Sequence, residues 1–153
     1  QLVGYPVIHL EQWGGPLRYV RFLEDVIISA LRDYGILGQK IAGNTGVWVG
    51  TQKIAAIGLK VSQGISMHGF ALNVSPDLSY FDHIVPCGMP DSQVTSMEDM
   101  LGHSVPVDEV SFCVAKYFGE AAGFTMEYRF SGILDIIELL GDSPHRSNNV
   151  VTS

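Results

Sequence analysis

Apolar residues between Leu17 and Tyr34 recur every three or four positions, the spacing of a helix that buries one face. The apolar positions are Val20, Leu23, Ile27, Leu31 and Tyr34. Charged residues such as Arg21 and Glu24 fall mostly between them, so we expect these side chains on the other faces. Gly35 follows directly and is typical of the residue that ends a helix. The pattern predicts a helix over this stretch.

A second helix is predicted from Val107 to Ala121. Its apolar stripe consists of Val110, Val114, Tyr117, Phe118 and Ala121. Cys113 lies beside that stripe, and we expect it to be a small apolar core residue. Earlier in the chain, Thr95 and Glu98 have the spacing of a capping box, in which both side chains accept backbone N–H groups at a helix start. This spacing predicts a short helix there.

Strands are predicted where β-branched and apolar runs are bounded by turn residues. Leu2–Leu10 has a proline near its start, which favours an edge strand or the first strand after a loop. Val47–Val49 and Lys53–Leu59 are separated by a short polar turn and predict a β-hairpin. Ser66–Val74 predicts one more strand. Prolines and a glycine interrupt Ser75–Pro90, which we expect to be an irregular surface connection.

Hairpins and separate helices without βαβ alternation are typical of an α+β domain. We expect residues 1–130 to form this domain and residues 131–153 to be a C-terminal extension. The extension starts with an apolar block, Ile133–Leu140, and continues as a tail rich in Ser and Asn from Gly141. That composition predicts disorder from about residue 141.

Composition supports one compact domain and excludes several kinds of partner. The chain has 153 residues, of which 46% are hydrophobic and 16% charged. Its net charge is −7, and its 9 basic residues form no run that would neutralise successive phosphates, so we expect no nucleic-acid partner. The longest apolar stretches fall far short of the roughly 20 residues that cross a bilayer, so we expect no membrane span.

The chain has two cysteines, Cys87 and Cys113. Neither belongs to a CxxC motif or to a His/Cys cluster with zinc-ligand spacing, so no metal site is predicted. Free thiols in a reducing compartment are the simpler interpretation, and a single disulfide stays open as the alternative.

Cys87 lies between Pro86 and Gly88 in the predicted connection. A cysteine in such a loop does not pack on a regular element, and Gly88 lets a substrate approach closely. An accessible nucleophile and a partly buried loop cysteine without a role are both compatible with the pattern, because reactivity depends on pKa and exposure.

Lys53 opens an otherwise apolar strand, where its ammonium would border a low-dielectric region. A cation near a thiol favours the thiolate, and partial burial favours a lysine that accepts a proton, so a Cys/Lys pair is suited to acyl transfer. An ordinary strand-edge lysine is the alternative. His68 is either a general base or a hydrogen-bonded structural residue. The glycines do not form a GxGxxG phosphate loop, so no nucleotide site is predicted.

Several motifs between Gly46 and Ser96 carry a family resemblance. They are Gly46–Val49 (GVWV), Lys53–Gly58 (KIAAIG), His68–Val74 (HGFALNV), Asp77-Leu78 with Phe81, and Ile84–Gly88 (IVPCG) with Val94-Thr95-Ser96. In this order they resemble the lipoyl(octanoyl) transferase family of lipoate biosynthesis. The resemblance extends from Gln1 to about Phe118. It implies the fold of biotin and lipoate protein ligases, with a mixed sheet flanked by helices.

The resemblance implies an acyltransferase that moves an octanoyl group from octanoyl-acyl carrier protein to a lysine of a lipoyl domain. Cys87 matches the family's nucleophile and Lys53 the lysine that activates it, and the implied intermediate is an acyl-enzyme thioester. Six residues match the acyl pocket: Ala56, Ile57, Gly58, Gly69, Phe70 and Ala71. No cofactor is implied. The implied acceptors are lipoyl domains of 2-oxoacid dehydrogenase complexes and the glycine cleavage H protein.

Family members carry an Arg-Gly-Gly motif and a Thr-Tyr-His-Gly-Pro-Gly motif before the segment equivalent to Gln1–Pro6, and this chain has neither. The resemblance therefore implies the C-terminal portion of a transferase, with a fold incomplete at its N-terminus. Bacterial relatives are cytoplasmic, whereas eukaryotic ones work in mitochondria or plastids; the tail outside the family pattern slightly favours a eukaryotic organelle. Two alternatives stay open: an ATP-dependent lipoate-protein ligase, and an inactive homologue that binds carrier or lipoyl domains.

Overall fold

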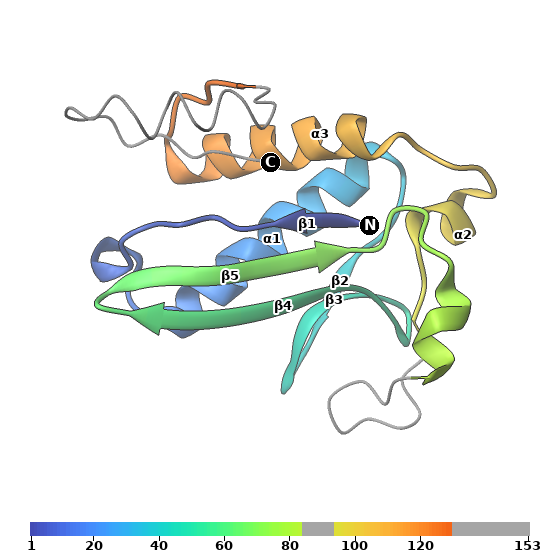
Figure 1. Cartoon of the computed structure of the whole chain (residues 1–153), viewed down its shortest axis with the longest axis horizontal. Helices are drawn as coiled ribbons and strands as arrows, with labels where there is room; N and C mark the ends of the chain where they lie inside the picture. Colours follow the sequence, from blue (N-terminus) through green and yellow to red (C-terminus); the bar gives the residue numbers. More distant parts are fainter. Residues whose placement is uncertain (84–93, 130–153) are drawn as a thin grey trace.

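The computed structural model describes residues 1–83 and 94–129, which form a five-stranded sheet with helices on one side (Figure 1). The strands are β1 (Leu2–Gly4), β2 (Gln39–Ile41), β3 (Asn44–Val49), β4 (Gln52–Ser62) and β5 (Ile65–Leu72). Their order is β1-β5-β4-β3-β2, and each neighbouring pair is antiparallel. We expected a mixed sheet. In the described ranges, parallel pairing is limited to a single bridge between Lys53 and Val94.

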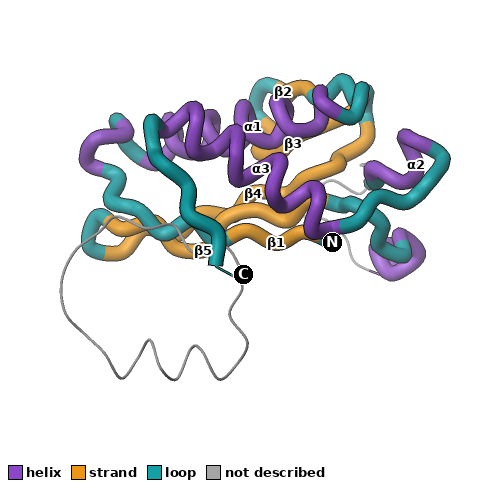
Figure 2. Tube along the Cα trace, turned by 90° about the horizontal axis from the view of Figure 1, so that it is seen from above, coloured by secondary structure: helices purple, strands orange, loops and turns teal. Residues whose placement is uncertain are grey.

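Two long helices lie on the same side of this sheet, as Figures 1 and 2 show together. The helices are α1 (Pro16–Asp33) and α3 (Val107–Ala122); the shorter elements are α2 (Met97–Leu101) and the 3₁₀ helices η1 (Glu11–Trp13) and η2 (Leu78–His83). Helix α1 packs on β3 and β4, and α3 packs on α1 and β1. No described helix covers the opposite face of the sheet, which we call the open face.

The expected long helix is confirmed as α1, with Leu23, Ile27 and Leu31 fully buried. Gly35 follows it with a left-handed φ of 75°, and its amide donates to the carbonyl of Arg32 at 2.9 Å, so the helix ends where predicted. The expected place of Glu24 was wrong. Its side chain is fully buried, because it hydrogen-bonds within the molecule, not with solvent.

Helix α3 is confirmed, but two details of the C-terminal half differ from expectation. Ser96, not Thr95, caps α2: its hydroxyl accepts the backbone N–H of Asp99 at 3.1 Å. Thr95 is instead buried beside β4. The helix runs one residue further than predicted and its stripe ends at half-buried Ala122, four positions after Phe118, whereas Ala121 is exposed.

The predicted hairpin is β3–β4, and the next predicted strand is β5. Strand β1 is an edge strand as expected, but it is shorter than Leu2–Leu10. Pro6 has no N–H for a ladder, and the chain pairs with β5 again only at His9 and Ile65. The Ser66 hydroxyl closes this interval by donating to the carbonyl of Pro6 at 2.8 Å and accepting the amide of Ile8 at 2.9 Å.

The predicted connection Ser75–Pro90 contains η2, and its remainder from residue 84 lies outside the described residues. The extension 131–153, with its apolar block and expected disordered tail, also lies outside them. Within the parts of the chain that the structure describes, no helix combines the length and the apolar character needed to cross a bilayer.

Candidate active site

The six residues predicted to line an acyl pocket are three neighbouring cross-strand pairs of β4 and β5. Ala56 pairs with Ala71, Ile57 with Phe70, and Gly58 with Gly69. One stretch of antiparallel ladder therefore brings together residues that are eleven or more positions apart in sequence. They form a single group on the neighbouring strands β4 and β5 (Figure 1).

These six residues do not share one face, because side chains alternate along a strand. Phe70 belongs to the buried core and Ile57 packs against it, so both point towards the helices. Ala56 and Gly58 are exposed, and Ala71 is half-buried. The pocket role of all six residues stays a prediction, and Ile57 and Phe70 face the core side of the sheet. We call Ala56, Gly58 and Ala71 the small-residue strip of the open face.

The two glycines of the third pair have different surroundings. A Cβ on Gly58 would meet no atom within 4 Å. A Cβ on Gly69 would lie 2.0 Å from the carbonyl oxygen of Gly4 and 2.8 Å from Cδ of Pro6. Gly69 thus permits the close approach of the N-terminal segment to β5, whereas Gly58 leaves open space above the strip.

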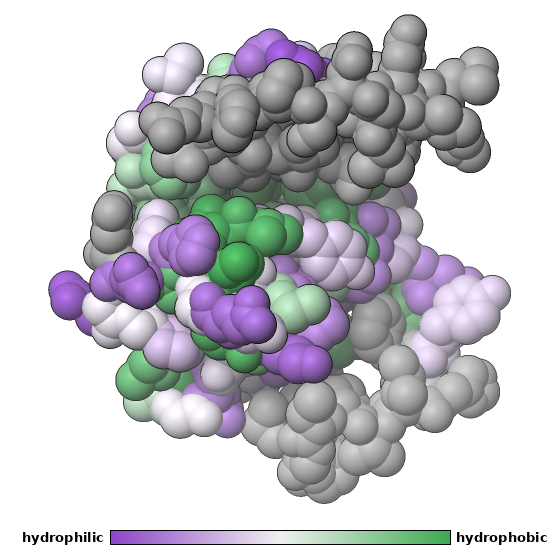
Figure 3. Space-filling model, turned by 60° about the vertical axis from the view of Figure 1, so that its left-hand side comes forward, coloured by the Kyte–Doolittle hydropathy of each residue, from purple (hydrophilic) through white to green (hydrophobic). Residues whose placement is uncertain are grey.

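The small-residue strip continues across β5 into an apolar row. Val3 of β1 pairs with Ala71, which pairs with Ala56, so the three share the open face. Val3 is 37% exposed, and Met67, two positions before Gly69, is 42% exposed. Figure 3 shows apolar surface gathered in the middle of one side of the molecule, bordered by hydrophilic residues.

Lys53 reaches the same face because β4 contains a β-bulge. Trp48 pairs with Lys53 and Val47 with Ala55, so Ile54 is an extra residue in β4. Val47 and Ala55 belong to the core under α1. In a strand without a bulge, Lys53, two positions before Ala55, would point at the same core. With the bulge, Lys53 lies with Trp48 on the face that carries the strip.

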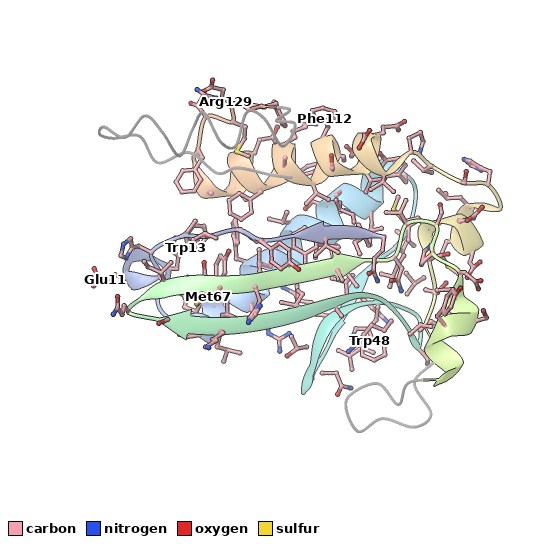
Figure 4. The ribbon with its side chains drawn as sticks, in the orientation of Figure 1. Glu11, Trp13, Trp48, Met67, Phe112 and Arg129 are labelled. Carbon is pink, nitrogen blue, oxygen red and sulfur yellow. The ribbon has the colours of Figure 1, made fainter. Side chains whose placement is uncertain are left out.

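Trp48 and Gly46 form the immediate surroundings of the Lys53 side chain. The ammonium lies 4.8 Å from the centroid of the Trp48 ring, a cation–π contact. A Cβ on Gly46 would lie 3.3 Å from Cε of Lys53. Figure 4 shows Trp48 at the end of the sheet where β4 begins and Met67 towards the other end of β5. Lys53 therefore lies at one end of the open face.

The segment that follows residues 84–93 is attached directly to the backbone of Lys53. The amide of Thr95 donates to the carbonyl of Lys53 at 3.0 Å. Asn73, only 5% exposed, ties this segment to the sheet: its side-chain amide donates to the carbonyl of Thr95 at 3.0 Å, and its backbone amide donates to Ile54 at 2.9 Å. Val94, seven residues after Cys87, also forms a parallel bridge with Lys53, so the chain returns beside Lys53 at this point.

Sequence reasoning missed Asn73 and Glu24 as residues of this region. Glu24 on α1 accepts the amide of Gly46 at 3.0 Å and pairs with Arg21 at 2.6 Å. The available signals were the position of Asn73 at the end of an apolar strand and that of Glu24 beside the buried stripe of a helix. Both are common on surfaces, so neither pattern distinguishes a buried partner.

Two further candidates have different outcomes. Cys87 lies outside the described residues, so its predicted role stays a prediction. His68 is exposed on β5, opposite Leu59, with a left-handed φ of 65°. Its backbone conformation is uncommon for a residue with a side chain, but its exposure favours neither of the two roles considered for it.

Cys113 is half-buried at the junction of α1 and α3, where it packs against the edge of the core instead of lying fully within it. Its thiol contacts the Asp33 carboxylate at 3.6 Å. Burial and the nearby Asp33 charge raise the pKa of Cys113 to about 11. Tyr117 donates to Asp33 at 2.6 Å, which lowers the pKa of Asp33 and raises that of Tyr117 to about 12. A raised pKa lowers the fraction of Cys113 that is present as the reactive thiolate.

Buried polar atoms near Lys53 include the indole N–H of Trp48 and the hydroxyl of Thr95, neither of which has a hydrogen-bond partner in the described structure. Such groups are costly to bury and are usually paired. No group of three His, Cys, Asp or Glu side chains in residues 1–83 and 94–129 is arranged to hold a metal ion.

Comparison with solved structures defines the class of fold. Lipoate-protein ligase A bound with ATP aligns with a TM-score of 0.65 at 15% identity, over 80% of this chain and 53% of that chain. A biotin protein ligase from Aquifex aeolicus aligns with a TM-score of 0.62 at 17% identity, over 76% of this chain and 50% of that one. The fold is that of biotin and lipoate protein ligases, as the resemblance implied.

Sequence comparison then gives the family. The family model described as the lipoyl protein ligase A/B catalytic domain matches residues 1–119. The chain belongs to this family. It is 46% identical over 143 residues to an octanoyltransferase of Caldicellulosiruptor saccharolyticus, covering 92% of this chain and 60% of that protein. It is 50% identical over 127 residues to an octanoyltransferase of Solibacter usitatus, covering 82% of this chain and 57% of that protein.

The chain covers only part of the length of these relatives. The chain spans 60% and 57% of the lengths of these two curated octanoyltransferases. The described residues thus hold the sheet, Lys53 and the small-residue strip, within a stretch that corresponds to somewhat more than half of a relative.

Proposed function

We propose that the protein is an octanoyltransferase that forms an acyl-enzyme on Cys87, and that Lys53 serves as the proton acceptor for this thiol. The observation that carries the proposal is the place of Lys53. The bulge in β4 turns it onto the open face, at the end of the small-residue strip and beside the segment that returns from Cys87. The similarity to octanoyltransferases supports the same reaction.

The reaction has two acyl transfers. The Cys87 sulfur attacks the carbonyl carbon of octanoyl-acyl carrier protein, and the carrier's sulfur leaves. The proton of Cys87 passes to Lys53 and from there to the departing thiolate. The amine of an acceptor lysine then attacks the Cys87 thioester, gives an amide, and releases Cys87 as a thiol. No cofactor takes part in either step.

The small-residue strip fits the acyl chain. Ala56, Gly58 and Ala71 leave room over the sheet, and Val3 extends the apolar contact surface. Each buried CH₂ group contributes about 0.8 kcal/mol, so the length of the covered strip selects the length of the chain. The proposed protein substrates are octanoyl-acyl carrier protein as donor and lipoyl domains, including the glycine cleavage H protein, as acceptors.

The experiment is a transfer assay with octanoyl-acyl carrier protein and a lipoyl domain, in the presence and absence of ATP. We expect transfer without ATP, and loss of at least about a hundredfold in rate on Lys53→Met, the scale of a lost general base. Lys60→Met is the matched control, because Lys60 lies on the same strand and should leave the rate unchanged.

The alternatives give different results in this assay. Among the structural neighbours is a lipoate-protein ligase bound with ATP, so a ligase-like reaction would require ATP and free acid. A binding scaffold would retain the lipoyl domain without modifying it. Either result would contradict the proposed transferase.

A further inference from the structure

Glu24 is the only charged residue among the fully buried side chains that the structure describes in α1, and it has two partners. Its carboxylate pairs with Nη1 of Arg21 at 2.6 Å and accepts the backbone N–H of Gly46 at 3.0 Å. Arg21 is 37% exposed, so only the acidic half of the pair is fully buried. The carboxylate therefore joins α1 to the start of β3.

A buried ion pair rarely stabilises a fold more than apolar residues of the same size would. We therefore consider how the buried carboxylate fixes the position of the groups that it binds. Here the backbone partner is Gly46, two residues before Trp48 on β3.

Gly46 lies against the bulge of β4. Its φ is 122°, and a Cβ there would lie 2.5 Å from the carbonyl oxygen of Ala55 and 3.3 Å from Cε of Lys53. Gly46 therefore lies close to the Ala55 backbone and to the Lys53 side chain, the residues on either side of the extra residue Ile54. A shift of Gly46 would move the two features that place Lys53: the bulge and the side chain itself.

We infer that Glu24 is a positioning residue for Lys53. By holding the amide of Gly46, its carboxylate fixes β3 against the bulge and keeps the Lys53 side chain over Trp48 on the open face. This inference deepens the proposed function, because it gives a reason for the position of Lys53. The positioning itself does not depend on that function, but its importance for catalysis rests on it.

The test measures the amine of Lys53 directly. The protein is labelled with a limiting amount of acetic anhydride, and mass spectrometry of the peptides compares the four lysines, Lys40, Lys53, Lys60 and Lys116. The other three serve as internal references. Because the readout needs no octanoyl transfer, it separates failure of this inference from failure of the proposed function.

Two double variants differ only in the oxygen offered to Gly46. Arg21→Met with Glu24→Leu removes both charges and the acceptor, so no unpaired charge stays buried. Arg21→Met with Glu24→Gln keeps an acceptor oxygen. We expect Lys53 labelling to rise about threefold or more in the Leu variant, since the ammonium leaves the Trp48 ring, and to stay near the original value in the Gln variant.

Asp25→Asn is the control on the same helix, because Asp25 pairs with Lys40 at 2.6 Å and should change only Lys40. Equal Lys53 labelling in the two double variants would overturn the inference. If the Leu variant does not fold, the inference is tested by measuring the rate of hydrogen exchange at the Gly46 amide of the unaltered protein. Slow exchange supports the inference, and exchange at the rate of an unprotected amide overturns it.

Discussion

Lys53 and Trp48 are cross-strand partners whose side chains make a cation–π contact, with the Lys53 ammonium 4.8 Å from the centroid of the indole ring. Trp48 is 2% exposed but does not belong to the core cluster under α1. The Lys53 ammonium therefore lies over a buried aromatic ring, on the face of the sheet that no described helix covers. The contact exists only because Ile54 is an extra residue between Lys53 and Ala55.

This contact depends on the ring and not on the indole N–H, which has no partner in the described residues. We expect Trp48→Ala to lower the free energy of unfolding by about 3–5 kcal/mol, the usual cost of removing a buried aromatic ring. Trp48→Phe should cost less than about 2 kcal/mol, because it keeps an aromatic face under Lys53. Urea denaturation measures both. A Phe variant as unstable as the Ala variant would show that the N–H has a partner.

Substitutions of Gly58 and Gly69 should affect different properties: donor preference for Gly58 and stability for Gly69. Gly69→Ala should destabilise the protein by about 1–3 kcal/mol, because its Cβ would overlap the carbonyl oxygen of Gly4. Gly58→Ala has open space, so it should leave the stability within about 0.5 kcal/mol. It should nevertheless shift donor preference towards acyl chains shorter than octanoyl. Thermal unfolding and a series of acyl donors measure the two effects.

If Gly58→Ala instead destabilised the protein and left the donor preference unchanged, this would contradict the proposal that the small-residue strip contacts the acyl chain.

Much of this fold is predictable from the sequence, because long periodic segments specify their own elements. The stripe through Leu23, Ile27 and Leu31 gives α1, and the alternation around Gly50 gives the β3–β4 hairpin. The β-bulge at Ile54 was not predicted. A bulge adds one residue without changing the composition of the strand, so no local pattern shows that Lys53 leaves the core face.

Partners distant in sequence account for the other differences. Glu24 is buried because Gly46, 22 positions later, offers it an amide. Ser96 takes the capping role expected of Thr95, because the backbone of Thr95 is bound to Lys53 and Asn73. Family resemblance supplied the six pocket residues, but only the strand register shows that Ile57 and Phe70 point towards the helices.

Asn73 should be a strong determinant of stability at this end of the sheet. Asn73→Ala removes the donor to the Thr95 carbonyl and the acceptor for the side chain of Gln1, at 3.0 and 2.8 Å. We expect a loss of about 1–3 kcal/mol in the free energy of unfolding, since a buried carbonyl is left without its partner. Gln1→Ala, which removes only the exposed partner, should cost under about 1 kcal/mol. Equal effects would contradict the assigned network.

Cys113 should react slowly. With its pKa raised to about 11 from 9.0, its thiolate fraction at pH 8 is about a hundredfold below that of an ordinary thiol. Asp33→Asn should speed alkylation of Cys113 by iodoacetamide, and Asp25→Asn on the same helix should not. Peptide mass spectrometry measures both. Alkylation of the unaltered Cys113 at the rate of a free cysteine peptide would contradict the assignment.

The same shift predicts a pH dependence of stability. A raised pKa favours the protonated thiol in the folded state, so this contribution is complete below about pH 9 and is lost as the pH rises towards 11. The melting temperature should fall over this range, and less so in Cys113→Ala. An identical fall in both proteins would show that other groups cause it.

The central claim is acyl transfer through Cys87, and intact mass spectrometry after incubation of the full-length protein with octanoyl-acyl carrier protein tests it most directly. The account predicts one octanoyl adduct, absent in Cys87→Ser, slowed in Lys53→Met, and discharged on addition of a lipoyl domain. Octanoyl transfer to the lipoyl domain that persists in Cys87→Ser would contradict it.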